Sequence, residues 1–227
     1  MNINADFSQR VVVSSEHEPW VASPLPGVER RMLDRIGDEV ARATSIVRYA
    51  PNSSFSAHTH GGGEEFFVLN GIFSDEHGDY GPGTYVRNPP GSKHRPSSAG
   101  GCTIFVKLRQ MLESDRARVC IDTSTAVWQS GPTAGVETLG LYQFGAEQVS
   151  LQRWRAETRL PVYSASGGEE IFVLNGSFAN EHGHYPQGVW LRHPPGCEHE
   201  PFTVTGCTLY IKRGHLSDVI GAGGSLR

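Results

Sequence analysis

The sequence predicts an all-β protein with two tandem jelly-roll barrels, because it repeats itself and because its apolar runs have the length of strands. The segment GGEEFFVLNG at 62–71 recurs as GGEEIFVLNG at 167–176, and EHGDY at 76–80 recurs as EHGHY at 181–185. The offset is the same in both cases, since 167 − 62 = 105 and 181 − 76 = 105. Equal offsets indicate a duplicated unit, and short apolar runs bounded by Gly, Pro, Asn and Asp indicate the strands of a double-sheet jelly roll.

Four parts are expected along the chain. Residues 1–26 precede the repeat and are expected to form an N-terminal extension that packs on one barrel. Residues 27–112 form the first barrel and residues 113–213 the second, because charge and polarity rise between the two copies. Within the first barrel, residues 29–43 have some helical character, but a glycine and β-branched residues favour strand and loop. The tail 214–227 is rich in small residues and is expected to be flexible.

The composition is that of a globular protein in a reducing compartment. The chain has 227 residues, and its 20 Lys and Arg against 24 Asp and Glu give a net charge of −4. That charge argues against a nucleic-acid binder that works by bulk electrostatics. The four cysteines form no CxxC pair, and no apolar stretch approaches the roughly 18 residues of a membrane span. We therefore expect a cytoplasmic protein that binds neither nucleic acid nor membrane.

The first copy carries a set of residues that suits a divalent transition metal. His58 and His60 are two apart, so on a strand both imidazoles point to the same side. Glu64 follows three glycines that let the chain turn back tightly, and His94 follows the rigid turn NPPGSK. Three neutral imidazoles and one carboxylate are ligands for Zn, Mn, Fe, Ni or Cu. The pattern therefore indicates these four residues as candidate metal ligands.

The same residues resemble the two sequence motifs of the cupin superfamily. Residues 58–71 fit H-x-H-x3-E-x6-G, and residues 83–94 fit G-x5-P-x-G-x2-H. The asparagine expected four residues after the last histidine is replaced by Ser98. The surrounding segments HTHGGGEEFFVLNG, DEHGDY and GCTIFVKL are similar to the cupin domain of ChrR-type anti-sigma factors. The resemblance implies two tandem cupin-type double-stranded β-helix barrels, and it implies His58, His60, Glu64 and His94 as metal ligands.

The resemblance also implies a cofactor, but only part of the ChrR-type function. ChrR-type proteins join a zinc-binding helical domain, which holds a sigma factor, to a C-terminal cupin that also binds zinc. The first hundred residues here contain no HxxxCxxC motif, so the sigma-binding domain is not carried over. One divalent metal per chain is expected, with zinc as the first expectation and iron, manganese or nickel as alternatives.

The second copy keeps the framework glycines and prolines but has lost two of the four ligands. Adding 105 to each ligand position gives Tyr163, Ala165, Glu169 and His199. Alanine has no donor atom, and tyrosine is a poor ligand unless it is ionised. We therefore expect the second barrel to be structural or to form an interface. A rearranged site of Glu169, His193 and His199, with Tyr163 or Cys197 as a further donor, is the alternative.

Arginines are frequent in the first barrel, and two interpretations stay open for them. They are Arg30, Arg31, Arg35, Arg42 and Arg48. Such a stretch can bind an anionic ligand, whereas scattered arginines more often face solvent or pair with carboxylates.

Three classes of function fit these features. The first expectation is a zinc-dependent regulatory or stress-sensing module, with a sigma factor or another regulatory protein as its partner. The alternative is a metal-dependent enzyme, either a dioxygenase or a small-molecule lyase or isomerase, because an octahedral metal with four protein ligands keeps two positions open. A structural cupin braced by its metal is the third class. No general base can be named, so the catalytic residues stay unknown. A homodimer is expected because exposed sheet edges need covering.

Overall fold

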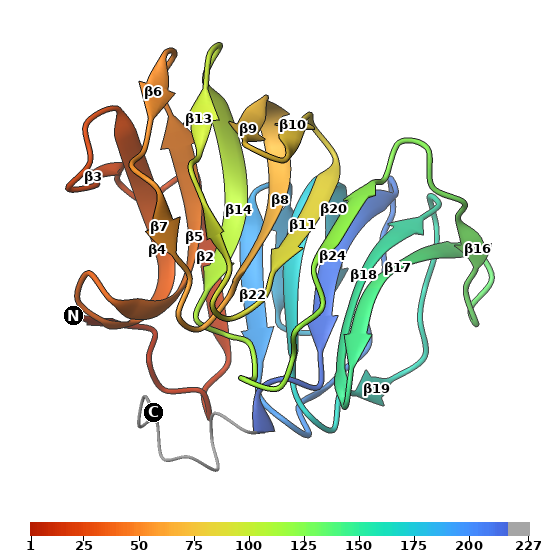
Figure 1. Ribbon diagram of the computed structural model, residues 1–227. Helices are drawn as coiled ribbons and strands as arrows, with labels where there is room; N and C mark the ends of the chain where they lie inside the picture. Colours follow the sequence, from red (N-terminus) through yellow and green to blue (C-terminus); the bar gives the residue numbers. More distant parts are fainter. Residues whose placement is uncertain (218–227) are drawn as a thin grey trace. The chain divides into compact units, whose positions relative to one another are not determined.

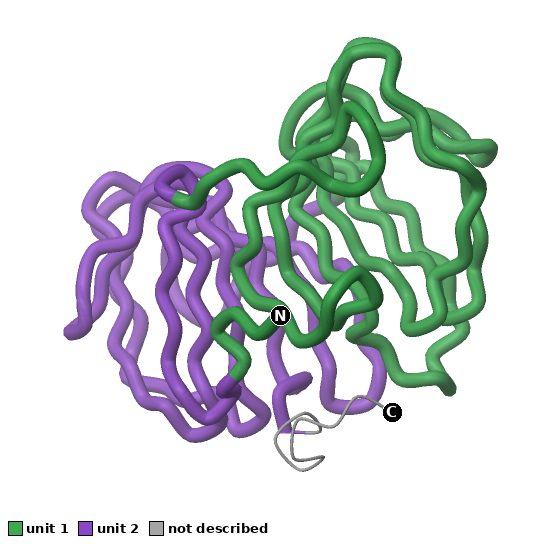
Figure 2. Tube along the Cα trace, turned by 90° about the vertical axis from the view of Figure 1, so that its left-hand side faces the viewer, with its two compact units in different colours: residues 1–5, 18–126 green, residues 6–17, 127–227 purple. Residues whose placement is uncertain are grey.

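The computed structural model describes residues 1–217, and the elements assigned within them are all β-strands. The chain forms two compact units, shown in different colours in Figure 2. Unit 1 contains residues 1–5 and 18–126, and unit 2 contains residues 6–17 and the chain from residue 127 onward. Among the described residues, no helix is long and apolar enough to cross a membrane. The expectation of an all-β chain with two tandem barrels is confirmed.

The main sheet of unit 1 has eight antiparallel strands (Figure 1). Their order is β1-β4-β5-β14-β8-β11-β15, with β3 paired to β4. The bounds are β1 Asn2–Ile3, β3 Val21–Ala22, β4 Val28–Gly37, β5 Ala41–Tyr49, β8 Glu64–Gly71, β11 Thr84–Asn88, β14 Cys102–Leu108 and β15 Val119–Asp122. The segment 29–43 therefore contributes to strands β4 and β5, as expected.

Two smaller sheets complete unit 1. One has the order β10-β9-β13-β6, and the other pairs β12 with β7. Their bounds are β6 Ser53–Ser54, β7 His58–Thr59, β9 Phe73–Asp75, β10 Gly78–Tyr80, β12 Lys93–His94 and β13 Ser97–Ser98. The pairing of β7 with β12 sets His94 directly opposite His58. This short sheet therefore brings two residues together that are far apart in the sequence.

Unit 2 repeats this architecture. Its main sheet has the order β16-β17-β18-β24-β20-β22-β2, with β21 paired to β20, and a separate small sheet pairs β19 with β23. The bounds are β2 Val11–Ser14, β16 Gln129–Ser130, β17 Val136–Phe144, β18 Glu147–Trp154, β19 Tyr163–Ser164, β20 Glu169–Asn180, β21 Gly183–Pro186, β22 Val189–His193, β23 Glu198–His199 and β24 Cys207–Arg213. Strand β2 pairs with β22 as β15 pairs with β11 in unit 1.

A glycine at the end of the first motif is required by the fold in both copies. The pairing of β8 with β14 and that of β20 with β24 each contain a β-bulge. Next to these bulges, Gly71 and Gly176 have φ angles of +72° and +70°. A Cβ on Gly71 would lie 2.1 Å from the carbonyl oxygen of Gly101, and one on Gly176 would lie 2.2 Å from that of Gly206. Only glycine fits both the positive φ and this close approach.

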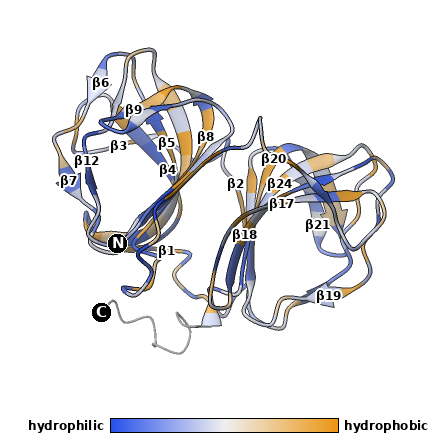
Figure 3. Ribbon diagram, turned by 45° about the vertical axis from the view of Figure 1, so that its right-hand side comes forward, coloured by the Kyte–Doolittle hydropathy of each residue, from blue (hydrophilic) through white to orange (hydrophobic). Residues whose placement is uncertain are grey.

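Each unit has its own hydrophobic core. In unit 1 the core includes the buried residues Phe66, Val68 and Phe73, and in unit 2 it includes Val173 and Leu209. Figure 3 shows hydrophobic colouring along β8 and β20, the strands that supply several of these residues. Burial of these side chains is the main favourable term in the stability of each barrel.

The units divide the chain at other positions than the repeat suggests. Residues 6–17, within the expected N-terminal extension 1–26, belong to unit 2 because β2 pairs with β22. Unit 1 continues to residue 126 rather than to residue 112. Within the expected flexible tail, Leu216 is fully buried, and residues 218–227 lie outside the described part of the chain.

Candidate metal centre

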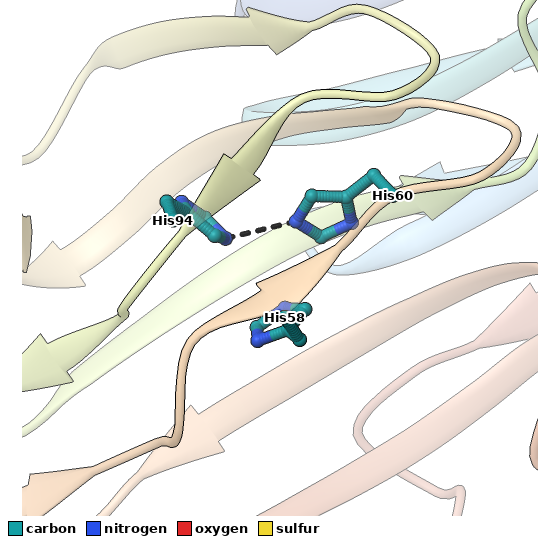
Figure 4. Close-up of side chains that lie close together, drawn as sticks. All are labelled: His58, His60 and His94. Atoms are coloured by element: carbon teal, nitrogen blue, oxygen red, sulfur yellow. Dashed lines mark hydrogen bonds between the residues drawn. The ribbon is translucent and has the colours of Figure 1, made fainter.

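The sheet of β7 and β12 positions the three histidines of the first copy. His58 and His94 are cross-strand partners, and the backbone N–H of His60 donates to the carbonyl of Ser92 at 2.9 Å. Figure 4 shows His60, just after β7, and His94, on β12, joined by a hydrogen bond, with His58 nearby. His60 and His94 are buried, whereas His58 is half-buried. The HxH spacing and the NPPGSK turn therefore place their side chains in one cluster.

Glu64 joins this cluster because the glycine turn reverses the chain. The N–H of Gly63 donates to the carbonyl of His60, and the φ angle of Gly63 is +77°. A Cβ at this position would lie 2.4 Å from Sδ of Met111, so a side chain here would have to displace Met111 as well as adopt the positive φ. Glu64 then starts β8 opposite Asn88, whose Nδ2 donates to Glu64 Oε2 at 3.0 Å. This hydrogen bond orients the carboxylate.

His60, His94 and Glu64 lie at the separations that ligands of one metal ion have, and His58 lies beside them. Nε2 of His60 lies 2.9 Å from Nε2 of His94, and each of these atoms lies 3.5 Å from Glu64 Oε2. The ligand atoms of His58, His60 and His94 are all within 4.8 Å of one another. Metal-ligand bonds of about 2.0–2.2 Å in tetrahedral or octahedral geometry put ligand atoms roughly 3 to 3.5 Å apart. The structure thus brings the four expected residues together, and their role as ligands stays a prediction.

Hydrogen bonds on the outer side of two imidazoles keep a lone pair on their inner nitrogens, the atoms that would bind a metal. Nδ1 of His94 lies 3.1 Å from Oδ2 of Asp75. Burial of Asp75 is outweighed by hydrogen bonds from His77 and His94, which lower the pKa of Asp75 and keep it ionised. His94 therefore donates from Nδ1 and has a lone pair on Nε2. His58 Nδ1 lies 3.2 Å from the carbonyl oxygen of Ser56, which fixes the same tautomer.

Burial favours the uncharged imidazole that metal binding needs. Burial and the neighbouring His58 lower the pKa of His60 to about 4, so His60 is neutral at pH 7. Burial raises the pKa of Glu64. A divalent cation would compensate the charge of Glu64 and that of Asp75, because two carboxylates balance one such ion. The donor set therefore fits a divalent transition metal.

The sequence pattern did not indicate Asp75 as part of the site. Its counterpart in the second copy suggests a substitution that tests its role. Adding 105 gives Asn180. The Asp75→Asn variant is expected to bind metal about 10–100-fold more weakly, because it removes the charge behind His94 but keeps the shape of the side chain. Competition with a coloured chelator measures this change. Because unit 2 folds with asparagine here, a variant with unaltered metal affinity would contradict the proposed role of Asp75.

A cavity of about 200 Å³ adjoins three of the four residues. His58, His60 and Glu64 line one part of it. Apolar side chains such as Val47 and Ile104 line another part. A metal held by these ligands would therefore be accessible to a small molecule, and apolar walls with few polar groups are typical of small-molecule sites.

The equivalent position of unit 2 holds an arginine next to the glutamate. Nε of Arg213 donates to Oε2 of Glu169, and Nη2 of Arg213 donates to the hydroxyl oxygen of Tyr163 at 3.1 Å. The hydroxyl of Tyr163 lies 3.1 Å from both oxygens of Glu169. Subtracting 105 from Arg213 gives Leu108 in unit 1. The substitution is visible in the repeat, but its pairing with Glu169 is not, because the sequence does not show which side chains meet.

Two histidines lie beside this ion pair and keep the rearranged site open. His193 Nδ1 lies 3.6 Å and His199 Nε2 lies 3.5 Å from Glu169 Oε1, and the ligand atoms of these three residues are within 4.8 Å of one another. Both imidazoles are buried, and within the described residues their ring nitrogens have no hydrogen-bond partner. However, the charge of Arg213 already neutralises Glu169. A cation added here would be buried next to a guanidinium, which is unfavourable.

Comparison with known protein families gives a match to both halves of the chain. The sequence model of the ChrR cupin-like domain matches the chain twice, over residues 8–112 and 116–217. The chain belongs to the ChrR cupin-like family. Each match contains one copy of the repeat, so the family resemblance expected from the motifs is confirmed for both barrels. No curated protein matches the sequence.

Solved structures share the fold of this family member. A proposed dioxygenase from Nostoc punctiforme has a TM-score of 0.77 at 14% identity, with 92% of this chain and 84% of that chain covered. The protein Ylba from Escherichia coli has a TM-score of 0.70 at 14% identity, with 92% of both chains covered. The pirin YhhW from E. coli, solved with nickel(II), has a TM-score of 0.65 at 10% identity, with 90% and 98% covered. Identities this low show the fold alone.

Proposed function

We propose that unit 1 is a metal-dependent enzyme that acts on a small molecule, as a dioxygenase, lyase or isomerase. The observation that carries this proposal is the cavity of about 200 Å³ lined by His58, His60 and Glu64. A metal that only braced the barrel would need no such space beside its ligands. The cavity is small compared with most ligand sites, so the substrate would have few non-hydrogen atoms.

In this proposal, His58, His60, Glu64 and His94 hold one divalent metal per chain, with zinc as the first expectation and iron, manganese or nickel as alternatives. When bound, the metal would supply a Lewis acid that polarises a substrate oxygen. Asn88 orients the Glu64 carboxylate, and Asp75 fixes the tautomer of His94. The apolar walls of the cavity would exclude water and strengthen electrostatic interactions with the substrate.

A regulatory function is the second candidate, and the match to the ChrR cupin-like domain favours it. In this form, four ligands close a tetrahedral zinc site, and loss of the metal or oxidation of its surroundings alters the barrel. A sigma factor or another regulatory protein would then bind the barrels. The two candidates differ in the coordination number of the metal.

The enzyme proposal predicts a metal with open coordination positions. Elemental analysis of untagged protein, purified without nickel resin or chelator, is expected to give about one divalent metal per chain. After replacement by Co²⁺, we expect the weak visible absorption of five- or six-coordinate cobalt, which changes when azide is added. A strong four-coordinate spectrum that is insensitive to azide would overturn the enzyme proposal and favour the regulatory one. Absence of metal would overturn both.

A further inference from the structure

Two arginines line the same cavity as the candidate metal ligands. Arg30 and Arg35 both lie on strand β4 and contribute to the cavity wall. They are five residues apart, so a regular strand would point them to opposite faces. The register of β4 against β5 shifts between Met32 and Asp34, and this β-bulge returns Arg35 to the face of Arg30. The backbone irregularity thus places two guanidinium groups in one cavity.

The buried carboxylates near these guanidinium groups have other roles: Asp34 on β4 lies 3.8 Å from Arg42, and Glu64, which also lines the cavity, is a candidate metal ligand. Arg35 is 4% exposed, and its hydrogen bond within the described residues is to the carbonyl oxygen of Asp38. Burial and the charge of Arg30 lower the pKa of Arg35. Arg30 pairs with Glu39, whose side chain is 63% exposed, and the buried Nε of Arg30 has no partner among the described residues. Such a pair of cations is suited to a bound anion.

Unit 2 provides an internal comparison. Arg30 pairs with Val47 across the sheet. The unit 2 equivalent of Val47 is Gln152, since 47 + 105 = 152, and Gln152 pairs with Thr138. Thr138 is therefore the counterpart of Arg30. In the same way, Arg35 pairs with Ala43, and the equivalent Gln148 pairs with Gln143, so Gln143 is the counterpart of Arg35. Unit 2 therefore lacks both arginines and also lacks two of the metal ligands. The arginines and the complete ligand set occur together in unit 1.

We propose that the substrate of unit 1 is a small organic anion whose carboxylate is held by Arg30 and Arg35 while another oxygen faces the metal. This inference rests on the proposed function, because it places the anion between the arginines and the metal ligands. The guanidinium fork suits the two oxygens of a carboxylate, and the low-dielectric walls of the cavity strengthen the interaction.

Calorimetric titration of the metal-loaded full chain with acetate, malonate and succinate tests this assignment. We expect at least one of these carboxylates to bind, and the corresponding neutral amide not to bind. Arg35→Gln and Arg30→Thr install the residues of unit 2, so the barrel architecture tolerates them. Each is expected to weaken binding roughly 10–100-fold, as loss of a charge-assisted hydrogen bond does. The metal content of both variants is expected to be that of the wild type.

A matched control separates this effect from a general loss of positive charge. Arg48 lies on β5, is half exposed and pairs with Glu29 outside the cavity lining. Arg48→Gln is expected to leave carboxylate binding unchanged. Failure of all three carboxylates, or equal binding to wild type and Arg35→Gln, would overturn the inference. The proposed function would still stand if metal content and the azide response of the cobalt protein were as expected, so the two failures are distinguishable.

Discussion

The His94→Ala variant is expected to lose its metal, whereas the His199→Ala variant is expected to keep the metal content of the wild type. The two histidines occupy equivalent positions, since 199 − 94 = 105, and both are buried. His94 lies 2.9 Å from the Nε2 atom of His60 and has a carboxylate behind it, so its removal opens the ligand set. The loss of metal affinity is expected to exceed the roughly 10–100-fold effect of losing an outer partner. Elemental analysis and chelator competition measure it.

The matched pair also controls for stability. Both variants remove a buried imidazole of the same size, so both are expected to lower the melting temperature of the metal-free protein similarly. Only the wild type and His199→Ala are expected to melt at a higher temperature when metal is added, because a ligand that binds the native state stabilises it. A drop of about one metal equivalent in His199→Ala would show that Glu169, His193 and His199 form a second site. Full metal content in His94→Ala would contradict the assignment in unit 1.

The repeat and the spacing of the motifs were sufficient to predict the duplicated barrel and the cluster of unit 1, although His94 lies 34 residues beyond His60 in the sequence. The HxH spacing on a strand and the glycines before Glu64 determine locally where these side chains point. The constant offset of 105 then transfers each position to the other copy, and Gly71 and Gly176 show the same close backbone approach. Spacing of this kind is visible in a sequence.

The position of the two arginines and the assignment of β2 to unit 2 depend on pairings between strands, which a short stretch of sequence does not reveal. The bulge between Met32 and Asp34 decides that Arg30 and Arg35 share a face, and an alternating pattern would separate them. The pairing of Val11–Ser14 with β22 assigns the strand to unit 2, although it precedes the first barrel in sequence. Both arise from strand register, which is set by packing across the whole sheet.

The Arg213→Leu variant is expected to destabilise unit 2 by about 3 kcal/mol at pH 7, because it leaves the charge of Glu169 buried without its partner. Glu169 is fully buried, whereas the side chain of Arg213 is 32% exposed, so the lower end of the range for a broken buried pair applies. Leucine is the residue that unit 1 has at this position, Leu108. Metal content is expected to stay unchanged. Calorimetric unfolding and the fluorescence of Trp154 and Trp190 in unit 2 measure the change.

The pH dependence of stability distinguishes the loss of this charge pair from a simple packing defect. In the wild type, burial raises the pKa of Glu169, but the charge of Arg213 and hydrogen bonds outweigh burial and lower it from 4.5 to about 2. The resulting stabilisation is present above pH 4.5 and is lost as the pH falls from 4.5 towards 2. Without Arg213, burial raises the pKa of Glu169, so the variant regains stability relative to the wild type as acid protonates the carboxyl group.

An exposed ion pair in the same unit provides the control for this prediction. Nη2 of Arg155 lies 3.9 Å from Oε1 of Glu137, and the side chain of Arg155 is 77% exposed. Arg155→Leu is expected to change the free energy of unfolding by no more than about 1 kcal/mol, with no change in its pH dependence, because water screens exposed pairs. If Arg213→Leu behaved like this control, Arg213 would not be neutralising Glu169. The ion pair in the structure instead predicts a large, pH-dependent loss of stability in Arg213→Leu. Arg213 donates to Glu169, which is the equivalent of the candidate metal ligand Glu64, so in unit 2 a guanidinium group compensates the charge that a metal would compensate in unit 1.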